Sequence, residues 1–241
     1  MNFRGILLKI LKPNSLSLQR IEWVKKKLSS LEIGSNLIDI GAGEKYFKKY
    51  CSNLNYTSQD ICQYNGSGNE GLHMGTWDTK DTDIISDAAN IPVEDETFDN
   101  ALCTEVLEHA AHPIEILKEI FRILKPGGLA IITVPSLSLT HFAPHFYQAG
   151  FSKYFFKYHA QEIGFNILEL KTIGGAFDLI FAISTSIRPA IKSNKGIKKY
   201  LLTIGNMLIL LISGIFRLTL GLNFAKDISP MGTFVLLKKI E

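Results

Sequence analysis

The chain contains only three cysteines, Cys51, Cys62 and Cys103, and their spacing is not that of a metal-binding motif. An odd number of scattered cysteines gives no disulfide framework, so we expect a reducing, cytoplasmic environment. The net charge is small, at +3 over 241 residues. Because nucleic-acid-binding domains usually carry a concentrated basic stripe, we expect no nucleic-acid partner. Residues 1–12 lack the long apolar core and the small-residue cleavage site of a secretion signal, so we expect no export.

The most informative segment is residues 37–43, which read Leu-Ile-Asp-Ile-Gly-Ala-Gly. An apolar run that ends on two glycines predicts a strand, a tight turn and a helix that starts near Glu44. Glycine has no Cβ, so backbone N–H groups can approach a ligand closely, and a helix start adds unpaired donors. Asp39 precedes Gly41 by two residues, and its carboxylate would repel a pyrophosphate. The turn therefore suits a cationic cofactor.

On this turn and on later motifs, the chain resembles the class I S-adenosylmethionine-dependent methyltransferases, whose first motif ends a strand with Asp-x-Gly-x-Gly. Asp60 follows the run 55–59, where such folds place the acid that holds both ribose hydroxyls. Residues 87–92 read Asp-Ala-Ala-Asn-Ile-Pro, which is similar to the family's segment beside the adenine. Residues 94–103 and 124–134 are similar to the segments around its fourth and fifth strands. The most similar subfamily includes the ubiquinone and menaquinone methyltransferases.

The resemblance implies a fold and a cofactor. The fold would be a Rossmann-like α/β fold with a doubly wound seven-stranded sheet, mostly parallel, with an antiparallel last strand. We expect the sixth strand at 166–172 and the seventh at 232–239. The cofactor would be S-adenosylmethionine, and the residues expected to bind it are Asp39, Gly41, Ala42, Gly43, Asp60, Ile61, Asp87, Ala88 and Thr104. Many members carry a third glycine where this chain has Lys45, so the turn would have a different shape there.

The length fits one methyltransferase domain with additions. Residues 1–34 would form a helical cover, with an amphipathic helix over 16–31. Residues 35–135 would form the cofactor-binding core. Residues 176–225 would form an apolar helical insertion between the sixth and seventh strands.

Residues 104–109, Thr-Glu-Val-Leu-Glu-His, supply the candidate catalytic residues Glu105, Glu108 and His109. If the segment is helical, these three residues share one face. They would then position the acceptor, with His109 taking a proton because its ordinary pKa is near neutrality. The second interpretation is a divalent-metal site, as in the small-RNA 2′-O-methyltransferases, with a further ligand from His141, His145 or His159. The third is a helix end with no chemical role. We favour acceptor positioning and expect no metal.

Residues 135–150 follow the fifth strand and are rich in aromatic and histidine side chains. Loops at this edge of the sheet carry substrate specificity. We therefore expect this loop to form one wall of an acceptor pocket. The candidate residues are His141, Phe142, His145, Phe146 and Tyr147.

The insertion of roughly sixty residues is long for a compact domain. It contains an apolar stretch at 176–187, a basic connection at 188–199 and a longer apolar stretch at 200–222. A single membrane crossing would leave the last two strands on opposite sides of the bilayer. A helical hairpin that dips into one leaflet avoids this, and its basic turn suits anionic head groups. The alternative is a buried helical pair that forms a lid or a homodimer interface.

The predicted activity is methyl transfer from S-adenosylmethionine to a small-molecule acceptor, with a lipid-linked or sugar-containing molecule as a candidate class. Two alternatives from other functional classes stay open. One is a metal-dependent RNA 2′-O-methyltransferase. The other is a module that binds the cofactor without catalysis.

Overall fold

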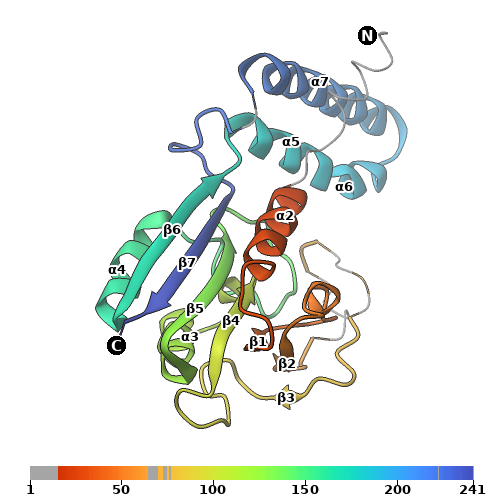
Figure 1. Ribbon diagram of the computed structural model, residues 1–241. Coiled ribbons are helices and arrows are strands. Elements are labelled where there is room, and N and C mark those ends of the chain that lie inside the picture. Colours follow the sequence, from red (N-terminus) through yellow and green to blue (C-terminus); the bar gives the residue numbers. More distant parts are fainter. Residues whose placement is uncertain (1–15, 65–69, 73–74, 76, 222, 241) are drawn as a thin grey trace. The chain divides into compact units, whose positions relative to one another are not determined.

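The computed structural model describes residues 16–64, 70–72, 75, 77–221 and 223–240 (Figure 1). Its contacts divide the chain into two compact units. We call the first the sheet unit, which comprises Arg20–Lys171 and Thr233–Glu241. We call the second the helical unit, which comprises Met1–Gln19 and Thr172–Gly232.

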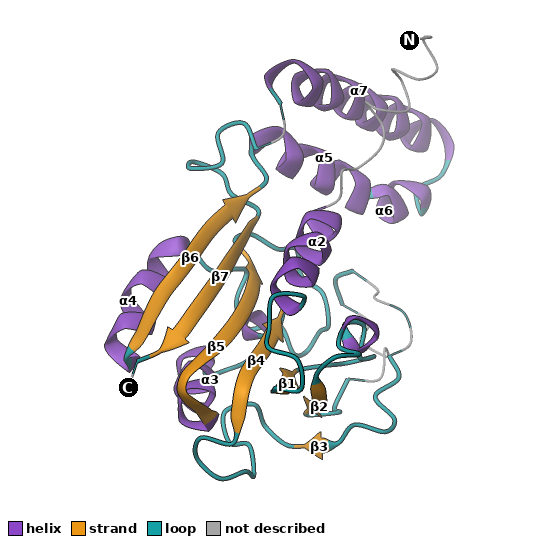
Figure 2. Ribbon diagram, viewed as in Figure 1, coloured by secondary structure: helices purple, strands orange, loops and turns teal. Residues whose placement is uncertain are grey.

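A seven-stranded sheet has the strand order β3-β2-β1-β4-β5-β7-β6, which confirms the predicted fold (Figure 2). Neighbouring strands from β3 to β5 are parallel, and β7 runs opposite to β6 (Figure 1). β3 has only two residues, too few for a recognisable strand pattern in the sequence. The strands are β1 (Asn36–Ile40), β2 (Asn55–Asp60), β3 (Ile84–Ile85), β4 (Phe98–Thr104), β5 (Leu124–Pro135), β6 (Phe165–Ile173) and β7 (Gly232–Lys239).

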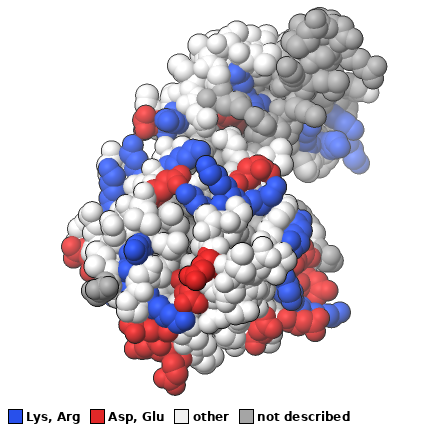
Figure 3. All heavy atoms as spheres, in the orientation of Figure 1, with Lys and Arg blue, Asp and Glu red and all other residues white. Residues whose placement is uncertain are grey.

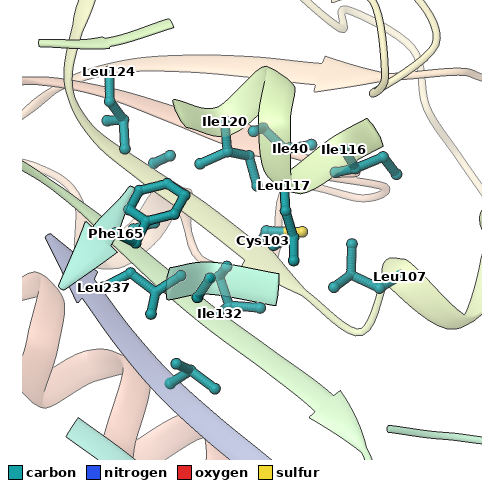
Figure 4. Close-up of a cluster of buried hydrophobic side chains, with 14 of the residues drawn as sticks. Ile40, Cys103, Leu107, Ile116, Leu117, Ile120, Leu124, Ile132, Phe165 and Leu237 are labelled. Atoms are coloured by element: carbon teal, nitrogen blue, oxygen red, sulfur yellow. The ribbon is translucent and has the colours of Figure 1, made fainter. Parts of the chain in front are cut away.

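The main hydrophobic core lies in the sheet unit, between the sheet and helix α3 (Pro113–Ile123) (Figure 4). α3 is strongly amphipathic, and Ile116, Leu117 and Ile120 are among the side chains that it buries completely or almost so. They meet apolar residues of the central strands, including Cys103, whose thiol pKa is raised by burial. Helix α4 (Lys153–Ile163) adds Phe156 and Ala160 to the same core. This core fixes the strand ends that surround the site.

The predicted amphipathic helix is α2 (Leu16–Leu28), which ends three residues before the expected end. On this helix Trp23, Val24 and Leu28 are buried. The expected helix after Gly43 is absent: residues 44–47 form turns, and only the short 3₁₀ helix η1 (Lys48–Tyr50) follows.

Lys45 explains the difference after the glycine turn, because its φ of 55° is left-handed and cannot continue an α-helix. Many members of the family have their third glycine at this position, and glycine adopts such angles easily. The lysine ammonium also donates a hydrogen bond to the carbonyl oxygen of Lys80. The chain therefore keeps a left-handed residue here without a glycine.

The helical unit contains the predicted helical insertion. Its helices are α5 (Ala176–Ser186), α6 (Arg188–Lys192) and α7 (Gly196–Leu220). α5 and α7 pack together, with the rings of Phe177 and Phe216 stacked 4.5 Å apart. The basic connection thus spans the short helix α6 and the start of α7.

Candidate functional site

A cavity of about 770 Å³ opens in the sheet unit where β1, β2 and β4 end. Parallel strands that end at one edge of a sheet commonly build a ligand site there. All the residues expected to bind the cofactor line this cavity, from Asp39 in β1 to Thr104 in β4. Glu105 and His109 line it too, whereas Glu108 is buried behind it.

The turn after β1 has the geometry of a close-approach loop. Gly41 and Gly43 have φ angles of 63° and 51°, which favour glycine. A Cβ on Gly41 would overlap the side chain of Val106, and a Cβ on Gly43 would lie 2.7 Å from Cζ2 of Trp77. No other residue type fits either position without displacing a cavity wall.

Asp60 is the last residue of β2, and its carboxylate is held by the backbone on both sides. Oδ2 accepts a hydrogen bond from the N–H of Gly43 at 2.9 Å, and Oδ1 accepts one from the N–H of Cys62 at 2.8 Å. A carboxylate oxygen has two acceptor sites, so each oxygen keeps one for a ligand. The side chain is therefore oriented to accept two further donors.

Asp39 lies deeper in the cavity and is only 2% exposed. Its Oδ2 accepts a hydrogen bond from the hydroxyl of Tyr56 at 2.7 Å. Burial raises its pKa to about 7, even though the Tyr56 hydrogen bond acts in the opposite direction. Near neutral pH the carboxyl is therefore close to half ionised, and a cation bound beside it would favour the ionised form.

The predicted helical face of Glu105, Glu108 and His109 does not exist. Glu105 has a left-handed φ of 55°, and only residues 107–109 form the 3₁₀ helix η2 (Leu107–His109). Glu105 instead pairs with Arg20 at 2.9 Å and accepts a hydrogen bond from the hydroxyl of Thr133 at 3.0 Å. These two contacts hold the Glu105 carboxylate at the cavity wall.

His109 has a fixed tautomer and a lowered pKa. Its Nδ1 lies 2.7 Å from the carbonyl oxygen of His145, so Nδ1 carries the proton and Nε2 keeps a lone pair. Burial lowers the pKa of His109 to about 4. The ordinary histidine pKa near neutrality therefore does not apply here, because burial removes water from the ring. The imidazole is uncharged at neutral pH and can accept a proton at Nε2.

Glu108 is buried behind His109, and its side chain is 1% exposed. Neither carboxylate oxygen has a hydrogen-bond partner among the described residues. Burial, and then the nearby Glu105, raise its pKa well above the ordinary value. Its Oε1 lies 3.7 Å from Nε2 of His109, and its backbone carbonyl accepts from the N–H of Tyr147 and of Gln148. The Glu108 backbone thus anchors the loop after β5.

The loop after β5 contributes Phe142, His145 and Tyr147 to the cavity lining. The ring of Phe142 contacts Tyr64 at 4.4 Å and Trp77 at 5.1 Å between centroids. The other two predicted loop residues, His141 and Phe146, pack against the ring of His109. The loop therefore builds an aromatic wall around the imidazole.

Of the three histidines considered as a further metal ligand, His141, His145 and His159, only His141 lies close to both Glu108 and His109. The ligand atoms of Glu108, His109 and His141 lie within 4.8 Å of one another. His145 offers its carbonyl oxygen to His109, and His159 lies on α4 against Phe155.

The cavity residues that sequence reasoning missed include Arg20, Tyr64 and Trp77. Arg20 lies on α2, 85 residues before Glu105 in the chain, and no motif links the two. Tyr64 and Trp77 belong to the segment between β2 and β3, which has no periodic pattern. The only sequence feature that could have pointed to Tyr64 and Trp77 is that their segment follows Asp60.

Known methyltransferases are among the proteins that this chain resembles. A demethylmenaquinone methyltransferase of Chlamydia trachomatis is 28% identical over 109 residues, which are 45% of this chain and 48% of that protein. The chain thus spans about half the length of this relative.

Two solved structures show the same fold. The cyclase SpnF has a TM-score of 0.57 at 16% identity, covering 95% of this chain and 85% of its own. Phosphoethanolamine N-methyltransferase 2 of Haemonchus contortus, solved with S-adenosyl-L-methionine, has a TM-score of 0.51 at 17% identity, covering 99% and 57%. The model of a methyltransferase domain family matches residues 16–170, which include β1 to β5 and all the described residues that line the cavity. With that match over more than half of its length, the chain belongs to the class I S-adenosylmethionine-dependent methyltransferases.

Proposed function

We propose that this protein transfers the methyl group of S-adenosylmethionine to a lipid-linked small-molecule acceptor. The observation that carries the proposal is one cavity in which the glycine turn, the Asp60 carboxylate and the His109 imidazole lie together. The cationic sulfonium would sit well with Asp39, whose ionised form a nearby cation stabilises. The family membership supports the cofactor, and the proposal assigns it to this cavity.

The residues present fit such a cofactor. Gly41 and Gly43 leave the space that a Cβ would fill, and the free acceptor sites of Asp60 suit two adjacent hydroxyls. Asp87 and Ala88 line the same cavity, as the resemblance to the adenine segment implies. When bound, S-adenosylmethionine supplies an electrophilic methyl group.

The chain itself contributes mainly alignment. Holding the acceptor close to the methyl donor and in line with it removes much of the entropic barrier of encounter. Nε2 of His109, which keeps a lone pair, accepts the proton of an acceptor hydroxyl. The Glu105 carboxylate, held at the cavity wall by Arg20 and Thr133, also positions the acceptor.

The aromatic wall supports an acceptor with apolar parts. The ring of Phe142 contacts the rings of both Tyr64 and Trp77 at the cavity wall. Such surfaces gain free energy by covering apolar groups. The relative named as a demethylmenaquinone methyltransferase is compatible with this class of acceptor.

A metal-dependent RNA 2′-O-methyltransferase is the second candidate, because Glu108, His109 and His141 group their ligand atoms within 4.8 Å. The Nδ1 contact of His109 to a carbonyl is also the orientation that metal-bound histidines take. Loss of activity in EDTA and recovery with a divalent ion would select this candidate. The favoured proposal expects activity that chelation does not change.

Calorimetry with S-adenosylmethionine tests the cofactor site. Asp60→Ala should weaken binding at least tenfold, because charged hydrogen bonds contribute about 1.5–3 kcal/mol each. Asp81→Asn, an exposed acid outside the cavity, is the matched control and should bind normally. An unchanged dissociation constant in a folded Asp60→Ala protein contradicts the assignment.

The acceptor is tested with labelled S-adenosylmethionine and a lipid extract of cells that lack the protein. The expected result is a labelled lipid whose mass rises by one methyl group. Cofactor binding without transfer to any lipid or RNA fraction points instead to a non-catalytic binding module.

A further inference from the structure

The packed helices of the helical unit have their polar residues inside. α7 buries Asn206, Leu210, Ser213, Gly214 and Arg217, which follow one another at helical spacings of three, four and one. Four of these five residues are polar or lack a side chain. A helix that packs in water normally buries an apolar stripe and exposes a polar face. The pattern of α7 is therefore the reverse of a water-exposed helix.

The buried contacts of α5 repeat this reversal, since α5 buries Asp178 and Ser184 together with Phe181. Nε of Arg217 lies 2.8 Å from Oδ1 of Asp178, and both side chains are less than 10% exposed. The Arg217 guanidinium also lies 4.6 Å from the centre of the Phe181 ring. The second Asp178 oxygen accepts from the backbone N–H of Gly175 at 3.1 Å. The helical pair thus satisfies its charges internally.

The outer surface of the same helices is apolar. α7 is the one helix among the described residues with the length and composition of a membrane span, and only 28% of its most apolar window is buried. Its exposed large apolar side chains are Ile197, Tyr200, Leu201, Leu202, Ile204, Met207, Leu208, Ile209, Leu211, Ile212, Ile215, Phe216, Leu218 and Leu220. α5 and its C-cap add Ile180, Ile183 and Ile187.

The apolar surface covers more than one side of α7. Met207, Leu208 and Ile209 are consecutive and all exposed, and successive residues of an α-helix point about 100° apart. Their side chains together span about 200° of the helix circumference. One flat protein partner covers a single side, whereas lipid chains can surround a helix.

The charges of the helical unit also point to a bilayer. No acidic residue occurs between positions 179 and 226. The connection between α5 and the apolar part of α7 instead carries five exposed basic side chains, Arg188, Lys192, Lys195, Lys198 and Lys199. In the space-filling view the segment that contains α5 to α7 is mostly uncharged, with blue side chains near the turn into α7 (Figure 3). A basic cluster beside an apolar surface suits anionic lipid head groups.

We propose that α5 to α7 insert into one leaflet of an anionic membrane without crossing it. β6 and β7, which flank the insertion, are neighbours in one sheet, so both ends of the insertion stay on the same side. α5 has 11 residues, about half the length that a bilayer crossing needs. The apolar faces meet acyl chains, and the basic connection meets phosphate groups. This membrane attachment is independent of the proposed methyl transfer.

Vesicle flotation of the full-length protein tests the proposal without cofactor or acceptor. The protein should float with phosphatidylglycerol-containing vesicles at low salt, float less as salt rises, and float weakly with pure phosphatidylcholine. Protein that stays in solution with both vesicle types contradicts the proposal. A concentration-dependent dimer that ignores vesicles assigns the apolar faces to a second copy instead.

Charge reversal at Lys195, Lys198 and Lys199 to glutamate should lower binding to anionic vesicles by about a hundredfold or more. The matched control reverses Lys157, Lys171 and Lys238, which are exposed in the sheet unit, and should bind nearly as well as the parent protein. Equal losses in both triple variants contradict a specific role for the connection.

Insertion depth is measured with Ile212→Trp, because the helical unit has no tryptophan at any described position. Lipids brominated on their acyl chains should quench the fluorescence of this tryptophan more strongly than that of the parent protein, whose tryptophans lie in the sheet unit. Protease added on the protein's own side of the vesicle should cleave the basic connection. Cleavage only from inside the vesicle overturns the non-crossing topology.

Discussion

Asp39 and His109 are both cavity residues whose pKa values are moved by burial, and they move in opposite senses. The pKa of the Asp39 carboxyl is raised to about 7, whereas the pKa of the His109 imidazole is lowered to about 4. Burial disfavours the charged form of each group, so it raises the pKa of an acid and lowers the pKa of a base. At neutral pH the His109 imidazole is therefore uncharged, whereas the Asp39 carboxyl is only about half ionised.

Asp39 should make the stability of the protein depend on pH. Its folded pKa of about 7 lies above the ordinary value, so the folded state binds the proton more tightly between about pH 4 and 7. The free energy of unfolding should therefore fall as pH rises through this window, by at most about 1.4 kcal/mol per pH unit. Asp39→Asn removes this contribution and keeps an oxygen for the Tyr56 hydroxyl.

Urea unfolding of the parent protein and of Asp39→Asn at pH 5 and pH 8 measures this effect. The variant should gain stability relative to the parent at the higher pH. Glu108, whose pKa is also raised, acts equally in both proteins, so the difference between them isolates Asp39. Parallel pH profiles for the two proteins contradict an elevated Asp39 pKa.

His109→Ala should lower turnover about a hundredfold or more, the usual effect of losing a general base, with cofactor affinity changed less than twofold. The imidazole contacts the aromatic loop and Glu108, whereas the Asp60 carboxylate is held by the backbone of Gly43 and Cys62. Because its pKa is lowered to about 4, the acidic limb of kcat that His109 causes should lie near pH 4. His159→Ala, on α4 outside the cavity lining, is the control. Unchanged turnover in His109→Ala removes its proposed role.

The turn after β1 shows how one residue changes an element. Lys45 ends the expected helix by its left-handed φ, and the chain continues through turns into η1. The cradle formed by Gly41 and Gly43 persists because their N–H groups are fixed by Gln59 and Asp60 of the neighbouring strand. Side chains of β2, rather than the dipole of a long helix, set the shape of this turn.

Lys45→Val should destabilise the protein by about 1 kcal/mol or more, because a β-branched residue is strained at a positive φ. Lys45→Gly should change stability less, since glycine adopts this conformation freely. Thermal unfolding of both variants compares them at one position. A valine variant as stable as the glycine variant shows that the backbone there is not left-handed.

The two units divide the functions of the whole molecule. Among the described residues, all those that line the cavity belong to the sheet unit, whereas the exposed apolar helices belong to the helical unit. The chain leaves the sheet after Ile173 and returns at Met231, where the Met231 N–H donates to the Ile173 carbonyl at 2.9 Å. The insertion therefore departs from two adjacent points and can be replaced by a short turn.

Replacing residues 175–230 with a short glycine-serine turn should leave S-adenosylmethionine affinity within about threefold of the parent value, a difference below 1 kcal/mol. The physical reason is that none of the described residues in this range lines the cavity. Calorimetry on the shortened protein measures the affinity, and circular dichroism checks that it folds. A folded shortened protein that has lost binding contradicts this division of function.

Much of the fold and the cofactor side of the cavity could be predicted because their signals are local. The run from Leu37 to Gly43 contains a strand and its turn within seven residues. Asp60 follows from the regular spacing of parallel strands in such a sheet. The helical insertion was visible as two apolar stretches, because helix formation needs only neighbouring residues.

Only the tertiary structure decided the chemistry around Glu105 and His109. It also decided which side chains of α5 and α7 face inward. Glu105 is held by Arg20 from α2, and Phe142 meets Trp77 from a segment without pattern. The pKa of His109 depends on how deeply a distant loop buries it, which no local window records. Likewise, the sequence determines that α7 is apolar, but only its packing against α5 decides that Arg217 turns inward to Asp178. Burial and charge pairing are properties of contacts between distant segments, so they exist only once the chain has folded.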